Sequence, residues 1–276
     1  MAWIVLIGSA HGRPPRPKSK FFNWPPICEF RSRTLLESSG ITKSDRLHGI
    51  YWTHNDSGNP AHLFAINLQG DIVAEIPIPG ALNIDFEDIA LADGLLYIGD
   101  IGDNLAIRKR LDIYVVKEPD PALRPPQPAE IVKTLHFSFP DGPADCEALF
   151  LYEGRIHVIT KEARKRPTLY RLDAERHDRL TPVPLCTVPI APVTGADVSR
   201  DGTMLAVISY GQLAVFDLSQ GIRSIQTQEP QRVSYPISIQ TEGCAFDGGD
   251  VIISSESGYL WRITAAEISK QLRNLP

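Results

Sequence analysis

Five acidic residues recur along the chain, and each is followed by small residues and then by an apolar segment. They lie roughly 50 residues apart, a spacing within the range of structural repeats. They are Glu37, Glu87, Glu147, Asp197 and Glu242. Carboxylate oxygens are the ligands that Ca²⁺ prefers, at about six to eight per ion. If the repeat gathers these acids at one place, they predict a site for a calcium-type cation.

A second group of polar side chains breaks the regularity of the repeat. Asn55 and Asp56 lie in HNDSGN (54–59), while Asp100 and Asp103 lie in GDIGDN (99–104). Asp100 is a further candidate metal ligand, and Asn55 and Asp103 are candidate ligand-binding residues. Turns rich in Asp, Asn and Gly also form for purely local reasons.

Basic and imidazole side chains lie close to these turns in the sequence. Arg108 belongs to the run 108–110, and Lys161 opens the run 161–166. Arg and Lys beside a cation site would suit a phosphate or carboxylate group, although charge runs are often solvated loops. His54 and Asp56 are the candidate catalytic proton acceptors.

The segments that must position these residues have the pattern of β-strands. They combine β-branched and aromatic residues, period-two alternation and turn residues at the joints. The predicted strands are 49–54, 62–68, 71–78, 95–100, 111–116, 130–139, 155–160, 168–172, 180–188, 204–209, 212–218, 251–256 and 258–263, each set preceded by a short strand at the acid.

About 50 residues and four strands per unit are typical of β-propeller blades. The last unit has only three clear strands, and one strand-like segment, 27–35, precedes the first unit. We therefore predict an all-β propeller of five four-stranded blades closed by this N-terminal strand, with six blades as the alternative. The predicted domain covers residues 21–263, and a capping box at Thr264–Glu267 opens a short helix in 264–276.

The topology of such blades predicts where the polar residues lie. The first strand of each blade is innermost and the second runs back antiparallel to it. The start of the first strand and the end of the second therefore share one face, where the acids would surround the mouth of the channel. Alternatively, each acid accepts hydrogen bonds from the backbone of a neighbouring blade and holds the ring together.

Composition restricts the remaining possibilities. A net charge of −5 argues against nucleic acid as a partner. The apolar stretch 2–10 is too short to span a bilayer. Residues 1–20 instead suggest a degenerate signal peptide and linker, or an extra strand. The four cysteines lack metal-site spacing and are either small buried side chains or two disulfides.

Several short sequence segments resemble those of a family of bacterial β-propellers near the SdiA-regulated and phytase-like (esterase-like) propellers. They are ESSGI (37–41), WTHNDSGN (52–59), FEDIA (86–90), YIGDIGDN (97–104), DCEAL (145–149) and TGADVS (194–199). The resemblance spans residues 37–263. It implies a divalent-cation site in the channel and a periplasmic or secreted protein, with a cytoplasmic location as the alternative because a basic leader is lacking.

Together these features predict a monomeric propeller with a calcium site and a small anionic ligand at the acidic mouth. If it is an enzyme, we expect a metal-assisted hydrolase of a phosphoester or another ester. The alternative is a non-enzymatic scaffold that binds a protein or peptide.

Overall fold

The computed structural model describes residues 25–162, 165–176, 178–236 and 240–270. Almost all regular structure within these residues is β-strand. The strands are β1 (Cys28–Glu29), β2 (Ser38–Lys43), β3 (Tyr51–Asn55), β4 (His62–Ile66), β5 (Ile72–Pro77), β6 (Phe86–Ala92), β7 (Leu95–Asp100), β8 (Leu111–Lys117), β9 (Ile131–Phe137), β10 (Cys146–Tyr152), β11 (Arg155–Thr160), β12 (Thr168–Arg176), β13 (Arg179–Thr187), β14 (Gly195–Val198), β15 (Met204–Ser209), β16 (Gln212–Asp217), β17 (Gln231–Ser234), β18 (Thr241–Asp247), β19 (Asp250–Ser255) and β20 (Tyr259–Ile263).

Consecutive strands pair antiparallel in sets of four. Three sheets have the orders β2-β3-β4-β5, β14-β15-β16-β17 and β1-β20-β19-β18. An eight-stranded sheet contains β6-β7-β8-β9 and β10-β11-β12-β13, joined only by a parallel contact between Arg179 of β13 and His136 of β9. We number these sets of four first to fifth in chain order, from β2–β5 to β18–β20 with β1.

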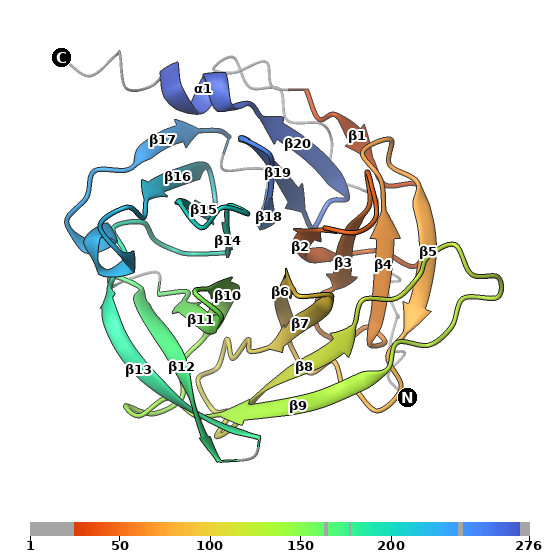
Figure 1. Cartoon of the computed structure of the whole chain (residues 1–276), viewed down its shortest axis with the longest axis horizontal. Helices are drawn as coiled ribbons and strands as arrows, with labels where there is room; N and C mark the ends of the chain where they lie inside the picture. Colours follow the sequence, from red (N-terminus) through yellow and green to blue (C-terminus); the bar gives the residue numbers. More distant parts are fainter. Residues whose placement is uncertain (1–24, 163–164, 177, 237–239, 271–276) are drawn as a thin grey trace, which may run out of the picture.

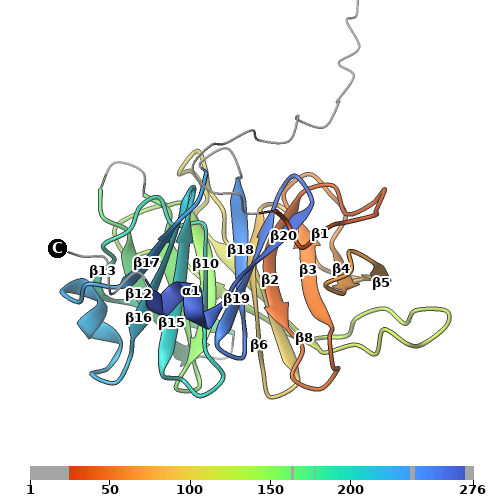
Figure 2. The same cartoon turned by 90° about the horizontal axis from the view of Figure 1, so that it is seen from above.

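The sets surround a common axis in the manner of a β-propeller (Figure 1). Strands β2, β6, β10, β14 and β18 lie nearest the axis, and the side view shows them running along it (Figure 2). The segment predicted at 27–35 supplies β1, which is only two residues long and pairs with β20. The N-terminal part of the described chain thereby completes the last set.

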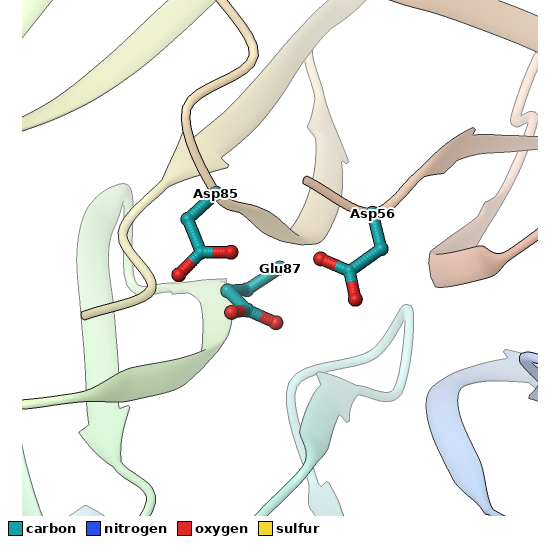
Figure 3. A group of neighbouring side chains, drawn as sticks. All are labelled: Asp56, Asp85 and Glu87. Carbon is teal, nitrogen blue, oxygen red and sulfur yellow. The ribbon is translucent and has the colours of Figure 1, made fainter. Parts of the chain in front are cut away.

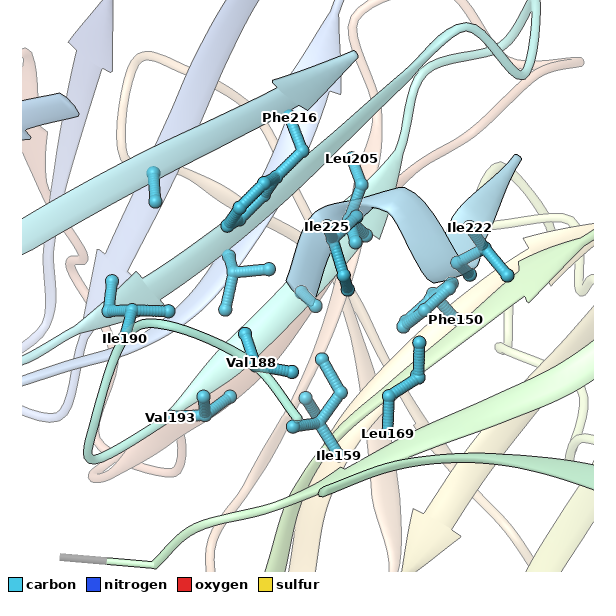
Figure 4. Packing of buried hydrophobic residues seen from close by; sticks show 14 of the residues in the cluster. Phe150, Ile159, Leu169, Val188, Ile190, Val193, Leu205, Phe216, Ile222 and Ile225 are labelled. Carbon is cyan, nitrogen blue, oxygen red and sulfur yellow. The ribbon is translucent and has the colours of Figure 1, made fainter. Parts of the chain in front are cut away.

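The hydrophobic core lies between neighbouring sets rather than at the axis. One cluster joins Phe150 and Leu169 of the third set to Leu205 and Phe216 of the fourth (Figure 4). Such packing fixes each inner strand relative to the next, and therefore fixes the polar residues at the strand ends.

The side chain of Asp88, on the inner strand β6, links neighbouring inner strands. Its carboxylate accepts backbone N–H groups from Leu149 on β10 and Ala196 on β14, at 2.9 and 3.3 Å, and from its own neighbour Ile89 at 2.9 Å. One fully buried side chain thus connects three inner strands.

The remaining elements agree with the prediction from the sequence, apart from small differences. Thr264 and Glu267 form the expected capping box, and helix α1 covers Ala265–Lys270. Strand β17, after the 3₁₀ helix η1 (Ile222–Gln226), was not predicted. All four cysteines are free thiols, and three are buried.

Residues 1–20, the predicted leader, lie outside the described part. Within the described residues, no helix has the length and apolar character required to cross a membrane.

Candidate functional site

One mouth of the channel is formed by the starts of the inner strands and the ends of the second strands, as the topology predicts. Equivalent backbone hydrogen bonds tie the two together in four sets. Asp56 donates to Glu37, Gly102 to Asp85, Lys161 to Asp145 and Glu256 to Gln240, with N–O distances of 2.9, 3.2, 3.0 and 3.3 Å. The same position after the second strand is occupied by Tyr210 in the fourth set and Glu256 in the fifth. One structural position therefore presents four different side chains and, in the second set, a glycine.

A β-bulge places a glutamate beside this position in three sets. The register shifts at Glu87 on β6, Glu147 on β10 and Glu242 on β18, so each glutamate is the extra residue of its strand. Gly40 occupies the bulge on β2, and β14 shows no register shift against β15. Bulges commonly redirect a side chain next to a functional site. Here they turn three glutamates toward the mouth.

Five carboxylates form two overlapping groups that share Glu87. Oxygens of Asp56, Asp85 and Glu87 lie within 4.8 Å of one another, and so do oxygens of Glu87, Asp145 and Glu147. The side chains of the first group converge from two segments of the chain, one with Asp56 and the other with Asp85 and Glu87 (Figure 3). Both groups offer only hard oxygen ligands, which suit Ca²⁺ or another hard cation.

Glu87 is the most unusual member of the cluster. Its side chain is buried, at 6% exposure, yet no described residue donates a hydrogen bond to its carboxylate. Gly102 leaves the space it occupies, because a Cβ there would lie 2.1 Å from Glu87 Oε1 and 2.4 Å from Asp85 Oδ2. A buried carboxylate without a donor is costly unless a proton or a cation compensates its charge.

The electrostatic environment of the mouth favours protonation in the absence of such a cation. Burial and the neighbouring Asp56 and Asp145 raise the pKa of Asp85 to about 6. Burial, followed by Glu147 and Asp56, raises the pKa of Glu87 well above its ordinary value. A divalent ion would reverse both effects by stabilising the charged forms.

Lys161 forms an ion pair with a carboxylate of the second group. Its ammonium pairs with Glu147 Oε1, and it lies 5.8 Å from the ring centre of Tyr210. Burial raises the pKa of Glu147 to about 8 although Lys161 lowers it. In Lys161 itself, burial opposes the charge but the adjacent Glu147 raises the pKa above its usual value.

Glu242 lies near this pair. Its Oε1 is buried and has no hydrogen-bond partner in the described part of the chain. Burial, with Glu147 and Glu256 nearby, raises its pKa to about 9. The structure therefore brings Glu87, Glu147, Glu242, Asp56 and Lys161 to one mouth.

Glu37 reaches the same mouth at its edge. It is exposed, and its Oε2 accepts a hydrogen bond from Asn59 Nδ2 at 3.2 Å. It precedes the bulge at Gly40 by three residues, so it is not the equivalent of the three bulge glutamates.

Asp197 does not share this mouth, and the prediction that groups it with the others is wrong. Its Oδ2 accepts the backbone N–H of Phe246 on the next set at 2.8 Å. It lines a cavity of about 1200 Å³ at the opposite end of the channel, together with Asp45, Lys43 and Asp247. The strand register gives the physical reason: Asp197 pairs with Ala206, three residues before the end of β15, so it stands farther along β14 than the bulge glutamates stand along their strands. For this residue, the alternative role of binding a neighbouring backbone is the one observed.

Asp100 and Arg108 support the site without entering it. Asp100 is fully buried, accepting the backbone N–H of Asp85 on Oδ1 and pairing with Arg108 on Oδ2, both at 2.7 Å. Arg108 also donates to the carbonyl of Gly102 at 2.7 Å. Their polar atoms are thus used to hold Asp85 and Gly102 in place.

Asn55 and Asp103 are likewise engaged in local structure. Asn55 Oδ1 accepts the backbone N–H groups of Leu36 and Glu37 at 2.8 and 3.1 Å. Both carboxylate oxygens of Asp103 accept backbone N–H groups within its own loop. The backbone N–H of Asp103, rather than its side chain, reaches the site, donating to Asp145 Oδ1 at 2.8 Å.

His54 lies below the mouth inside the protein. It is fully buried beside Gly40, its Nε2 has no hydrogen-bond partner among the described residues, and burial lowers its pKa to about 4. The ring is neutral at ordinary pH and packs edge-on against Phe86.

Asp85 and Asp145 were not among the predicted site residues. Both precede a bulge glutamate by two positions, as DFE (85–87) and DCE (145–147). This repeated Asp-X-Glu spacing in consecutive units is the signal that could have identified them. Asn83 is another omission: its Nδ2 donates to the carbonyl of Asp56 at 2.8 Å and links two loops of the mouth.

Comparison with known proteins supports the fold. No protein-family model matches the sequence, and no curated protein matches it. A solved gluconolactonase from Xanthomonas campestris is similar, at 12% identity and a TM-score of 0.50 over 87% of this chain and 88% of that chain. Virginiamycin B lyase from Staphylococcus aureus is similar at 13% identity and a TM-score of 0.47, over 84% of this chain and 96% of that chain.

At such identities the likeness concerns the fold alone. With the arrangement of the sheets, it supports assignment of the chain to the β-propellers.

Proposed function

We propose that the protein binds one divalent cation of the calcium type at Asp56, Asp85 and Glu87 and hydrolyses a small anionic ester there. The observation that carries the proposal is the carboxylate of Glu87, which is buried among other carboxylates without any donor in the described chain. We further propose that the four-strand sets are five blades, with β1 completing the fifth.

A bound cation supplies Lewis acidity toward a carbonyl or phosphoryl oxygen and lowers the pKa of a water molecule. The chain's own residues supply the rest. Lys161 holds the anionic part of the ligand, and Arg108 acts through Asp100 to hold the loop of Asp85. We assign proton acceptance to the half-buried Asp56, through the carboxylate oxygen that does not hold the cation, because the imidazole of His54 has no exposed surface.

Calorimetric titration with Ca²⁺ tests the first part of the proposal. The metal-free wild type is expected to bind one ion, and Glu87→Gln is expected to bind none. Glu229→Gln changes an exposed carboxylate paired with Arg232 and is the matched control. Absence of heat at millimolar calcium, with no metal in the purified protein, would refute the cation site.

Substrates of different chemistry test the second part. p-Nitrophenyl phosphate, p-nitrophenyl acetate and γ-butyrolactone are compared with calcium and with a chelator. Hydrolysis that requires calcium and is lost in Glu87→Gln supports the hydrolase.

A second candidate function, a non-enzymatic scaffold, is favoured by the apolar rim of the mouth. Five large hydrophobic side chains in the loops of Glu37, Asp85 and Gly102 are more than half exposed. They are Leu36, Leu82, Ile84, Leu105 and Ile107. Exposed apolar groups gathered around a site often mark binding of a protein or peptide. Inactivity on the whole panel, with and without metals, would favour this function.

A further inference from the structure

Glu87 belongs to both carboxylate groups of the mouth, so the site has the ligands of two adjacent cation positions. The first position is bounded by Asp56 and Asp85, and the second by Asp145 and Glu147. Paired cations clamp the attacking and leaving oxygens in many hydrolases. The two positions of this protein differ in the charged side chain that lies beside them.

The difference is a lysine at the second position. Lys161 Nζ pairs with Glu147 Oε1, and the backbone N–H of Lys161 donates to the carbonyl of Asp145 at 3.0 Å. The lysine is therefore fixed to the strand start that carries two of the three carboxylates. In the described chain, no lysine or arginine pairs with the carboxylates of Asp56, Asp85 or Glu87.

We propose that the ammonium of Lys161 takes the place of a second metal ion. The wild type then binds a single divalent cation between Asp56, Asp85 and Glu87, and the anionic group of its ligand bridges that cation and Lys161. This inference rests on the cation site of the proposed function and deepens it.

Charge and geometry both support this assignment. A lysine is a compact point charge with three donors, so it can hold Glu147 and an anionic oxygen at once. Its positive charge also repels a second divalent ion at the adjacent carboxylates. Removal of the ammonium would leave Glu87, Asp145 and Glu147 as three hard-oxygen ligands without a cation.

The number of bound calcium ions tests the inference, measured by calorimetry and by elemental analysis after dialysis. We expect one ion in the wild type and two in Lys161→Met, whose unbranched, uncharged side chain ends where the Cε of lysine lies. Lys161→Arg retains the charge and is expected to bind one ion. Lys117→Ala, which removes an exposed lysine paired with Glu130, is the control and also binds one.

A double variant shows where the additional ion binds. Lys161→Met combined with Glu147→Gln removes both the ammonium and a ligand of the second position, so the stoichiometry returns to one. Phosphate binding to this calcium-loaded variant is expected to be about tenfold weaker than to the wild type, because one charge-assisted hydrogen bond is lost.

The outcomes separate the two proposals. One ion in the wild type and one in a folded Lys161→Met, or two in the wild type, would overturn the role of Lys161 and leave the cation site standing. No ion in either protein would overturn the cation site itself. If Lys161→Met does not fold, unchanged phosphate affinity in calcium-loaded Lys161→Gln overturns the bridging role.

Discussion

Replacement of Glu87 by glutamine is predicted to stabilise the metal-free protein and to abolish its response to calcium. In the folded protein, oxygens of Asp56 and Asp85 lie within 4.8 Å of Glu87, and no described residue donates a hydrogen bond to the Glu87 carboxylate. Two unit charges at this distance repel by about 3.5 kcal/mol at an effective dielectric constant of about 20. Glutamine has a similar volume and removes this repulsion.

Protonation limits the size of the effect and makes it depend on pH. Burial, with the adjacent carboxylates, raises the pKa of Glu87 above its ordinary value of 4.5, so its contribution to folding becomes less favourable as the pH rises above that value. Each pH unit above 4.5 allows the charge of Glu87 to destabilise the folded protein by at most about 1.4 kcal/mol. This destabilisation therefore cannot exceed about 5 kcal/mol at pH 8 or about 1 kcal/mol at pH 5. We expect a gain of about 2 kcal/mol at pH 8 and almost none at pH 5.

Thermal melting in a chelator and then in excess calcium measures both effects. A gain of about 2 kcal/mol corresponds to a rise in Tm of about 4–8 °C in a protein of this size. Calcium at 100 times its Kd would stabilise the wild type by about 2.7 kcal/mol and Glu87→Gln not at all. A destabilised Glu87→Gln at pH 8, or one that responds to calcium like the wild type, would refute the reasoning. Glu229→Gln should change stability by less than about 0.5 kcal/mol.

Three further outcomes are expected. Gly102→Ala should weaken calcium binding at least tenfold in calorimetry, because the new Cβ would lie 2.1 Å from Glu87 Oε1 and must displace the carboxylate; unchanged affinity would show that Glu87 is not a ligand. Asp88→Asn should lower the free energy of unfolding in urea by about 2–4 kcal/mol, because one of its two acceptor oxygens becomes an NH₂ donor that faces the buried N–H groups of the inner strands; a loss below 0.5 kcal/mol would contradict this role. His54 titrates at about 4 in the folded protein and at about 6.5 when unfolded, so its contribution to stability is lost as the pH falls from 6.5 toward 4. The stability difference between the wild type and His54→Gln should therefore shrink by about 2–3 kcal/mol between pH 7.5 and 4.5, and a constant difference would contradict the buried neutral ring.

The strands could be predicted from the sequence because successive side chains of a strand point to opposite faces of its sheet. Burial of these faces produces apolar, β-branched segments that can be recognised. The segments 95–100, 155–160 and 204–209 coincide with β7, β11 and β15. Strand β17 was not recognised, since its sequence QRVS is short and mostly polar and carries little periodic signal. The length of β1 was overestimated, because apolar residues such as Phe30 and Leu35 are buried there without continuing the strand.

The sequence predicts at which end of the channel most of the acids lie. It does not predict how far along its inner strand each acid stands. Spacing alone treats Glu37, Glu87 and Asp197 as equivalent, whereas the position of a bulge decides which side chain turns toward the mouth. A bulge is set by hydrogen-bond register between strands, which a single sequence does not show. For the same reason Asp100 resembled a ligand although its oxygens hold Arg108 and the backbone of Asp85.

The inner strands present different side chains at their two ends. Their starts carry most of the carboxylates of the mouth, while their opposite ends line the cavity of about 1200 Å³, and no described residue that lines the cavity belongs to the two carboxylate groups. Asp88, between the two ends of β6, joins three inner strands through backbone N–H groups. Substitutions can therefore change the lining of the cavity without removing a carboxylate of the mouth.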